Sequence, residues 1–146
     1  MIFVDTNLIS ESVRSKPNPS TAVWIRSNDA QLAISTVVLA EIKYGIERIR
    51  PEERAKKLDQ YFQEMRWHFA GRIYAFDEAA AVVYGVIMGE AKRHGRTLST
   101  PDGMIAAIAL RHGGALATRN SKHFAIKGLK IVDPWGRFTQ EAWKTW

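Results

Sequence analysis

The sequence predicts an α/β protein, a three-layer α/β/α sandwich with a central parallel sheet. Short apolar runs alternate with longer segments of helical periodicity, the order expected when helices join parallel strands. The 146 residues, of which 46% are hydrophobic, are enough for one domain with a sizeable core. No internal repeat, low-complexity segment or linker interrupts the chain. We therefore expect one domain over residues 1–135 and a C-terminal tail over 136–146.

Capping and chain-breaking residues mark the boundaries of the expected elements. Ser, Thr or Asp precedes most of the helices, and Gly or Pro occurs near their ends. Pro51 is expected at the first position of its helix, and Gly95 just beyond the end of another. In order, we expect a strand at 1–4, a helix at 20–27 capped by Ser20, a strand at 31–34, a helix at 36–50 capped by Ser35 or Thr36, a helix at 51–69, a strand at 72–76, a helix from Asp77 to Gly95, a helix at 100–112 capped by Thr100, and strands at 115–118 and 129–132. In the tail, Phe138, Ala142 and Trp143 suit a short amphipathic helix or a frayed end.

Composition limits the class of protein. There is no cysteine, which excludes disulfides, Cys-ligated zinc and thiol catalysis. No apolar run approaches the roughly 18 residues that span a membrane, and no basic segment precedes the first apolar stretch, so we expect neither a membrane span nor a signal peptide. A cytoplasmic protein is expected. The net charge of +6 favours attraction to a polyanion such as nucleic acid.

The first apolar run ends at a carboxylate. Asp5 follows the expected strand directly, and Thr6 and Asn7 add a hydroxyl and an amide beside it. A strand-terminal Asp commonly caps a turn. In open α/β sheets, however, the carboxyl edge is also where ligands bind.

Glu41 occupies a position where packing would favour an apolar residue. Its helix carries an apolar stripe that includes Val38, Ile42, Gly45 and Ile46, and helical spacing places Glu41 within that stripe. A buried carboxylate without a partner costs several kcal/mol or changes its pKa. We therefore expect Glu41 to contact either a basic side chain or a metal ion.

Two further polar residues map to the same edge of the sheet. Asp102 lies in the first turn of its helix, where acids complement the helix dipole, but it shares a face with the apolar Ile105 and Ala109. Asn120 follows a strand, as Asp5 does. Each residue alone has an ordinary explanation, but their convergence on one edge predicts a metal site. A metal site in a basic protein indicates nuclease chemistry.

The motifs resemble those of the PIN domain family, specifically the VapC-like toxins of bacterial toxin–antitoxin pairs. The resemblance runs from Met1 to about Trp135, and its motifs are Val4-Asp5-Thr6-Asn7, Leu39-Ala40-Glu41-Ile42-Lys43-Tyr44-Gly45, Asp102-Gly103-Met104-Ile105-Ala106-Ala107 and Thr118-Arg119-Asn120 with Phe124. It implies a PIN-like nuclease domain and a Mg²⁺- or Mn²⁺-dependent endoribonuclease that hydrolyses phosphodiester bonds.

The resemblance also assigns roles to individual residues. It makes Asp5, Glu41 and Asp102 the acidic metal ligands, and its fourth acidic position falls on Asn120. An amide oxygen can bind a hard cation but adds no negative charge, so we expect one firmly held metal and a weaker second site. Thr6 and Thr118 match supporting hydroxyl positions. Lys43, Arg119 and Lys122, neighbours of these residues in sequence, are expected to bind RNA.

The partners implied by the resemblance are a cognate antitoxin and an RNA substrate, with tRNA as the family-level guess. An antitoxin segment is expected in a groove formed by the helices of residues 20–50 and 51–69. A homodimer is typical of the family, and a hetero-octamer with antitoxin is also compatible with it.

Three other functions remain compatible with the residues. A catalytically weak or inactive nucleic-acid-binding module is supported by Asn120. A phosphohydrolase for small molecules is disfavoured because the chain lacks a phosphate-cradling glycine loop and is basic. A nuclease that cuts DNA has the same sequence signature as one that cuts RNA, and only the resemblance favours RNA.

Overall fold

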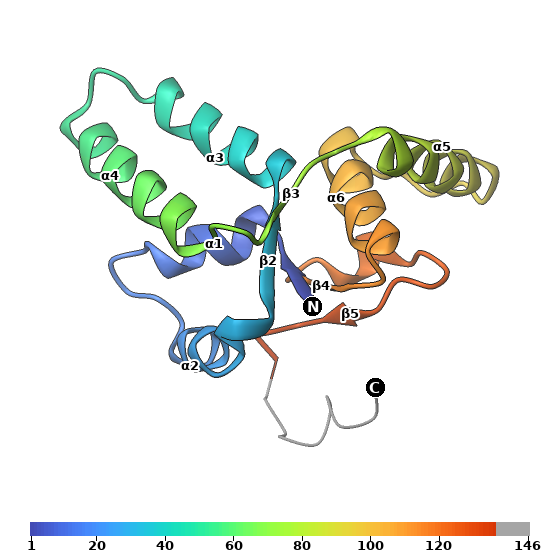
Figure 1. Cartoon of the computed structure of the whole chain (residues 1–146), viewed down its shortest axis with the longest axis horizontal. Helices are drawn as coiled ribbons and strands as arrows, with labels where there is room; N and C mark the ends of the chain where they lie inside the picture. The colour runs from blue at the N-terminus through green and yellow to red at the C-terminus, as the bar shows by residue number, and fades with distance from the viewer. Residues whose placement is uncertain (137–146) are drawn as a thin grey trace.

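The computed structural model describes residues 1–136 and contains a five-stranded parallel sheet in the order β3-β2-β1-β4-β5. Helices cover both of its faces, with α1 to α4 on one side and α5 and α6 on the other (Figure 1). This arrangement confirms the predicted sandwich. The strands are β1 (Ile2–Val4), β2 (Leu32–Ser35), β3 (Ile73–Tyr74), β4 (Ala115–Ala117) and β5 (Ile131–Val132). The helices are α1 (Thr6–Ser12), α2 (Pro19–Asn28), η1 (Asp29–Gln31), α3 (Thr36–Arg48), α4 (Glu53–His68), α5 (Glu78–Arg93), α6 (Thr100–Arg111) and η2 (Ser121–Phe124), where η denotes a 3₁₀ helix.

Strand β1 lies at the centre of the sheet and is covered on both faces. Its Ile2 pairs with Leu32 of β2 on one side and with Ala115 of β4 on the other. Phe3 and Val4 point to opposite faces and are both buried. Because parallel strands covered by helices must be apolar on both faces, the uninterrupted apolar run at the N-terminus becomes the central strand.

The structure corrects three of the expected helix starts. Asn18, not Ser20, caps α2 and accepts hydrogen bonds from the amides of residues 20 and 21. Ser99, not Thr100, caps α6. Pro51 does not open a helix, because it follows a cis peptide bond in a turn and α4 begins at Glu53. The expected caps Ser35 and Asp77 are confirmed, as is Gly95 beyond the end of α5 with its positive φ of 65°.

Helix α1 was not expected. It has only seven residues, too few for an apolar period to stand out, and its buried Leu8 and Ile9 read as part of an irregular connection. Asp5 is its N-cap and accepts a hydrogen bond from the Leu8 amide. The carboxylate at the end of β1 is therefore held between a strand and a helix start.

The topology brings separate segments to the carboxyl edge of the sheet. Residues that follow β1, β2 and β4 all emerge there because the strands are parallel. Helix α6 leads into β4 by way of a short turn at residues 112–114, so its N-terminus is returned to the same edge. Asp5, the start of α3 and the first turn of α6 are therefore neighbours in space although they are far apart in sequence.

Two remaining expectations concern the tail and the membrane. The tail residues Phe138, Ala142 and Trp143 lie outside the described part of the chain. Within residues 1–136, every helix is too short or too polar to cross a membrane.

Close packing of α5 against α6 predicts opposite effects for two helical glycines. A Cβ on Gly103 of α6 would lie 2.6 Å from the Met88 sulfur and 2.9 Å from the Tyr84 ring, whereas a Cβ on Gly45 of α3 would meet nothing within 4 Å. Gly45→Ala should stabilise the protein by up to about 1 kcal/mol through helix propensity. Gly103→Ala should destabilise it by about 1–2 kcal/mol through overpacking.

Urea unfolding of the two variants tests this contrast, because both gain the same helix propensity. Equal stabilisation by the two substitutions would show that α5 can move away from α6 at no cost.

Candidate active site

Asp5 is the most buried carboxylate at the carboxyl edge of the sheet. Its residue is only 5% exposed, and one carboxylate oxygen accepts the Leu8 amide of α1 at 2.9 Å. The turn-capping role and the functional role expected for this residue are therefore compatible, because a carboxylate has acceptor positions to spare.

Burial and neighbouring carboxylates raise the pKa of Asp5. Burial is the main reason why the pKa of Asp5 lies above its ordinary value, and the charges of Asp102 and Glu41 raise this pKa further. Hydrogen bonds from the Thr118 side chain and the Leu8 amide oppose the rise. Asp102 and Glu41 are thus close enough to Asp5 to disfavour its charged form.

Glu41 is held by a hydroxyl group from another element. Its Oε1 accepts a hydrogen bond from Thr6 Oγ1 at 2.6 Å, which joins α3 to the start of α1. Glu41 is half-buried, while Val38 and Ile46 on the same helix are buried. Of the two partners expected for Glu41, a basic side chain is not the one observed, since no ion pair within residues 1–136 includes this carboxylate.

Asp102 lies in the first turn of α6, where its backbone amide donates a hydrogen bond to the Ser99 hydroxyl oxygen. The side chain is half-buried, and the apolar residues that share its face, Ile105 and Ala109, are buried. No ion pair in the described part of the chain neutralises Asp102 either. Asp102 thus lies in the first turn of α6, at the carboxyl edge of the sheet.

The chemistry of this group suits a divalent cation. Three carboxylates without ion pairs among residues 1–136 form the donor set that hard cations prefer. In the present rotamers no three acidic or histidine side chains within residues 1–136 converge closely enough to enclose a metal ion.

The fourth expected residue, Asn120, lies at the exposed start of η2. The backbone amide of Asn120 donates a hydrogen bond to Thr118 Oγ1 at 3.1 Å, and its side chain makes no capping hydrogen bond. Thr118 itself is fully buried. The hydroxyl of Thr118 thus connects Asp5 with the backbone of Asn120.

The three expected RNA-binding residues lie in different surroundings. Lys43 pairs with Glu47 at 2.8 Å and with Asp59 at 3.0 Å, so its charge joins α3 to α4. Arg119 lies over the Trp135 ring, with 5.9 Å between Cζ and the ring centroid. Lys122 is exposed on η2. Arg119 and Lys122 are therefore the better placed of the three to meet a substrate at the acidic edge.

A separate cavity of about 350 Å³ lies on the face of the sheet that α1, α2 and α4 cover. Its lining is mostly apolar and includes Leu8, Ile9, Ile25, Met65 and Phe69. Helix α4 lines this cavity, as expected for the antitoxin groove, but the cavity is also lined by α1 and not by the expected α3. The sequence predicted a groove at these helices but indicated neither α1 nor its part in the lining.

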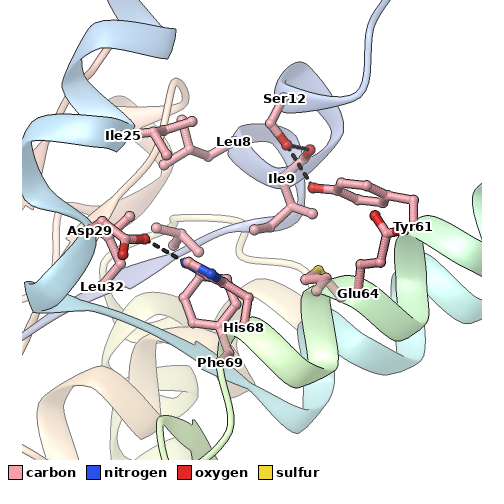
Figure 2. Close-up of a pocket in the computed structure, with 12 residues that line it drawn as sticks. Leu8, Ile9, Ser12, Ile25, Asp29, Leu32, Tyr61, Glu64, His68 and Phe69 are labelled. Carbon is pink, nitrogen blue, oxygen red and sulfur yellow. Dashed lines mark hydrogen bonds and ion pairs between the residues drawn. The ribbon is translucent and has the colours of Figure 1, made fainter.

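Two polar pairs flank the apolar lining of this cavity, as Figure 2 shows. Ser12 Oγ and Tyr61 Oη lie 2.7 Å apart, and His68 Nε2 lies 2.6 Å from Asp29 Oδ1. Both pairs connect α4 to segments far from it in sequence. Such long-range pairs leave no local sequence signal, so only the structure identifies them.

Comparison with known proteins identifies the class. Residues 2–129 match the PIN domain family, and the chain belongs to this family. It is 34% identical over 137 residues to Toxin FitB of Neisseria gonorrhoeae (strain ATCC 700825 / FA 1090), a match that covers 92% of this chain and 99% of that protein. It is 30% identical over 133 residues to the tRNA(fMet)-specific endonuclease VapC of Shigella flexneri, covering 90% and 96% of the two chains.

Solved structures agree with this assignment. A chain in the structure of FitAB bound to an IR36 DNA fragment is similar with a TM-score of 0.88 and 33% identity, covering 95% of this chain and 99% of that one. A chain of DNA-bound VapBC from Salmonella typhimurium is similar with a TM-score of 0.80 and 25% identity, covering 91% and 97%. The resemblance drawn from the motifs is therefore confirmed.

Because the pKa of Asp5 is raised, removal of its charge should stabilise the folded protein. The folded protein binds the Asp5 proton more tightly than the unfolded chain, so stability falls as the pH rises from the ordinary carboxyl pKa through the folded pKa. Asp5→Asn keeps an equally good helix cap and removes the charge. In EDTA at neutral pH, its melting temperature should exceed that of the unsubstituted protein, and the difference should shrink toward acidic pH.

Asp77→Asn is the matched control, because Asp77 caps α5 in the same way but is exposed. It should leave the melting temperature nearly unchanged. A lower melting temperature for Asp5→Asn at neutral pH would mean that the Asp5 charge stabilises the fold.

Proposed function

We propose that this protein is a metal-dependent endoribonuclease that acts as the toxin of a toxin–antitoxin pair. One observation carries the proposal: Asp5, Glu41 and Asp102 come from three distant segments, the charges of Glu41 and Asp102 both act on Asp5, and none of the three has a basic partner among residues 1–136. A fold would not retain such repulsion unless a cation relieved it during function. The names of the VapC relatives support RNA as the substrate, and Shigella flexneri VapC supports tRNA as its class.

Mg²⁺ or Mn²⁺ is the cation that fits the donor set. Asp5, Glu41 and Asp102 would hold it, and Mg²⁺ in particular accepts few protein carboxylates and retains several waters. When bound, the cation supplies Lewis acidity toward the scissile phosphate and an activated water. The chain lacks cysteine, and none of its histidines lies in the site motifs, so covalent catalysis by a side chain is disfavoured.

The surrounding residues position these carboxylates. The Thr6 hydroxyl donates to one oxygen of Glu41 and leaves the other for a ligand. A hydrogen bond from the Thr118 side chain and one from the Leu8 amide of α1 help to position Asp5. Asn120 offers a neutral amide oxygen at the rim. We infer one firmly held metal ion and a second site that is completed by the substrate phosphate.

The cavity between α1, α2 and α4 is the proposed docking site for the antitoxin. A predominantly apolar lining with polar pairs at its borders suits an inserted peptide segment with apolar side chains. The known structures of FitAB and VapBC assemblies support a partner of this kind. We further propose a homodimer, a hetero-octamer with the antitoxin, and action in the cytoplasm, where the RNA substrate is found.

A nucleic-acid-binding module without activity is the second candidate, and Asn120 is the observation that favours it. The two functions differ in one measurable respect, because a binding module would hold RNA equally well with EDTA and would not cut it. Cleavage of single-stranded DNA in place of RNA would support the DNA-directed alternative.

Asp102→Asn should reduce RNA cleavage by at least about a hundredfold, the cost typical of losing one electrostatic contributor to a transition state. The fold should be unaffected because the side chain is half-buried and has no ion pair among the described residues. Single-turnover cleavage of cellular RNA in Mg²⁺ or Mn²⁺ measures the loss.

Glu78→Gln provides the control, since Glu78 is the first-turn acid of α5 as Asp102 is of α6. It removes the same helix-dipole interaction away from the site and should cleave normally. Normal cleavage by Asp102→Asn would reject the assignment of the site.

Asn120→Asp should tighten Mn²⁺ binding and increase the number of ions bound, because it adds a negative charge at the fourth position. Calorimetric titration with Mn²⁺ measures both quantities. Ser121→Asp introduces the same charge one residue further along η2 and should have a smaller effect. Equal effects of the two substitutions would show that Asn120 contributes no ligand.

A further inference from the structure

Two segments that adjoin the proposed metal ligands in sequence carry basic residues and no acidic ones. Residues 91–101 and 119–130 contain no Asp or Glu. Their exposed members include Arg96 from the first segment and Lys122, His123 and Lys127 from the second. We call these four residues the basic track.

The structure joins the two segments into one surface. The guanidinium of Arg96, which precedes α6, donates a hydrogen bond to the carbonyl of Ala125, which follows η2. Arg96 and His123 also line a common shallow hollow with Leu98 and Ile126. Glu90 also lines this hollow and balances the charge of Arg96, so the excess positive charge of the basic track comes from the exposed Lys122 and Lys127 outside it.

Both segments lead directly to the proposed metal ligands. Lys122 is two residues beyond Asn120, so their Cα atoms are at most about 7 Å apart. On the other segment, Leu98 and Ser99 follow Arg96 closely, and Ser99 caps the helix that carries Asp102. The basic track therefore adjoins the proposed metal ligands along both segments of the chain.

Several cations on the α1–α4 side, by contrast, are paired with acids. Lys43, Arg50 and Lys56 are bound to acids of α3 and α4, and Arg14 is bound to Glu11. No ion pair within residues 1–136 engages Arg96, Lys122 or Lys127. Their charges are available to an external polyanion.

We propose that the basic track binds the phosphodiester backbone of a single RNA strand on one side of the scissile bond. The inference rests on the proposed ribonuclease function and adds the path that the substrate follows. Lysine and arginine contacts to phosphates provide affinity and orientation without reading the base sequence. The α1–α4 side, by contrast, presents the apolar cavity, so the substrate and the antitoxin approach from different sides.

The test compares two double variants that remove the same charge. Lys122→Gln/Lys127→Gln changes the basic track, and Arg26→Gln/Lys57→Gln changes exposed residues of α2 and α4. Binding of a mixed-sequence single-stranded RNA oligonucleotide is measured by fluorescence anisotropy in EDTA over a range of salt concentrations. Cleavage of the same strand in Mg²⁺ or Mn²⁺ is measured in parallel, and thermal melting checks that both variants are folded.

The basic-track variant should bind RNA several-fold more weakly, and the slope of log K against log salt should become shallower by about 0.7 for each lysine removed. Its KM should rise with kcat nearly unchanged, because the lysines do not touch the reacting phosphate. The control variant should match the unsubstituted protein in both assays.

Equal RNA binding and equal salt slopes for the two double variants would overturn the inference. Failure of the proposed function gives a different result, in which the unsubstituted protein binds RNA but does not cut it with either metal. The binding measurements still decide the role of the basic track in that case.

Discussion

Repulsion between carboxylates at the carboxyl edge of the sheet is the constraint on which the site depends. Asp5 is buried at the end of the central strand, and burial together with the charges of Glu41 and Asp102 raises its pKa. Hydrogen bonds from Thr118 and from α1 reduce this cost without removing the charge. The fold thus keeps carboxylates with unfavourable electrostatics at the edge where three crossovers meet. A divalent cation is the simplest way to relieve this electrostatic cost.

The acidic edge divides the molecule into two functional sides. The crossovers between β1, β2 and β3 place α1 to α4 on one face, where the apolar cavity lies (Figure 1). The crossover from β3 to β4 places α5 and α6 on the other face, and its loop joins the segment after β4 through the contact between Arg96 and Ala125. A partner protein and a nucleic acid can therefore approach the same carboxylates from opposite sides.

The parts of the fold that follow from local signals could be predicted. The apolar run ending at Asp5, the caps Ser35 and Asp77, and the glycine after α5 define the main elements, and the parallel sheet follows from their alternation. Features that depend on contacts distant in sequence could not. Helix α1 is too short for periodicity, the bond from Thr6 to Glu41 spans 35 residues, and the pairing of Lys43 with Asp59 is decided by how α4 packs on α3. The candidate acids could be named from spacing, but only the structure shows that none of them forms an ion pair within residues 1–136.

The central claim is that Asp5, Glu41 and Asp102 together hold one divalent cation. Anomalous diffraction from crystals soaked in Mn²⁺ tests it most directly, because the signal locates the ion independently of any activity. We expect one strong peak between these three carboxylates, with their side chains turned toward it, and loss of the peak in the Asp5→Asn variant. A strong peak elsewhere, or no peak at this edge in a protein that still cuts RNA, would contradict it.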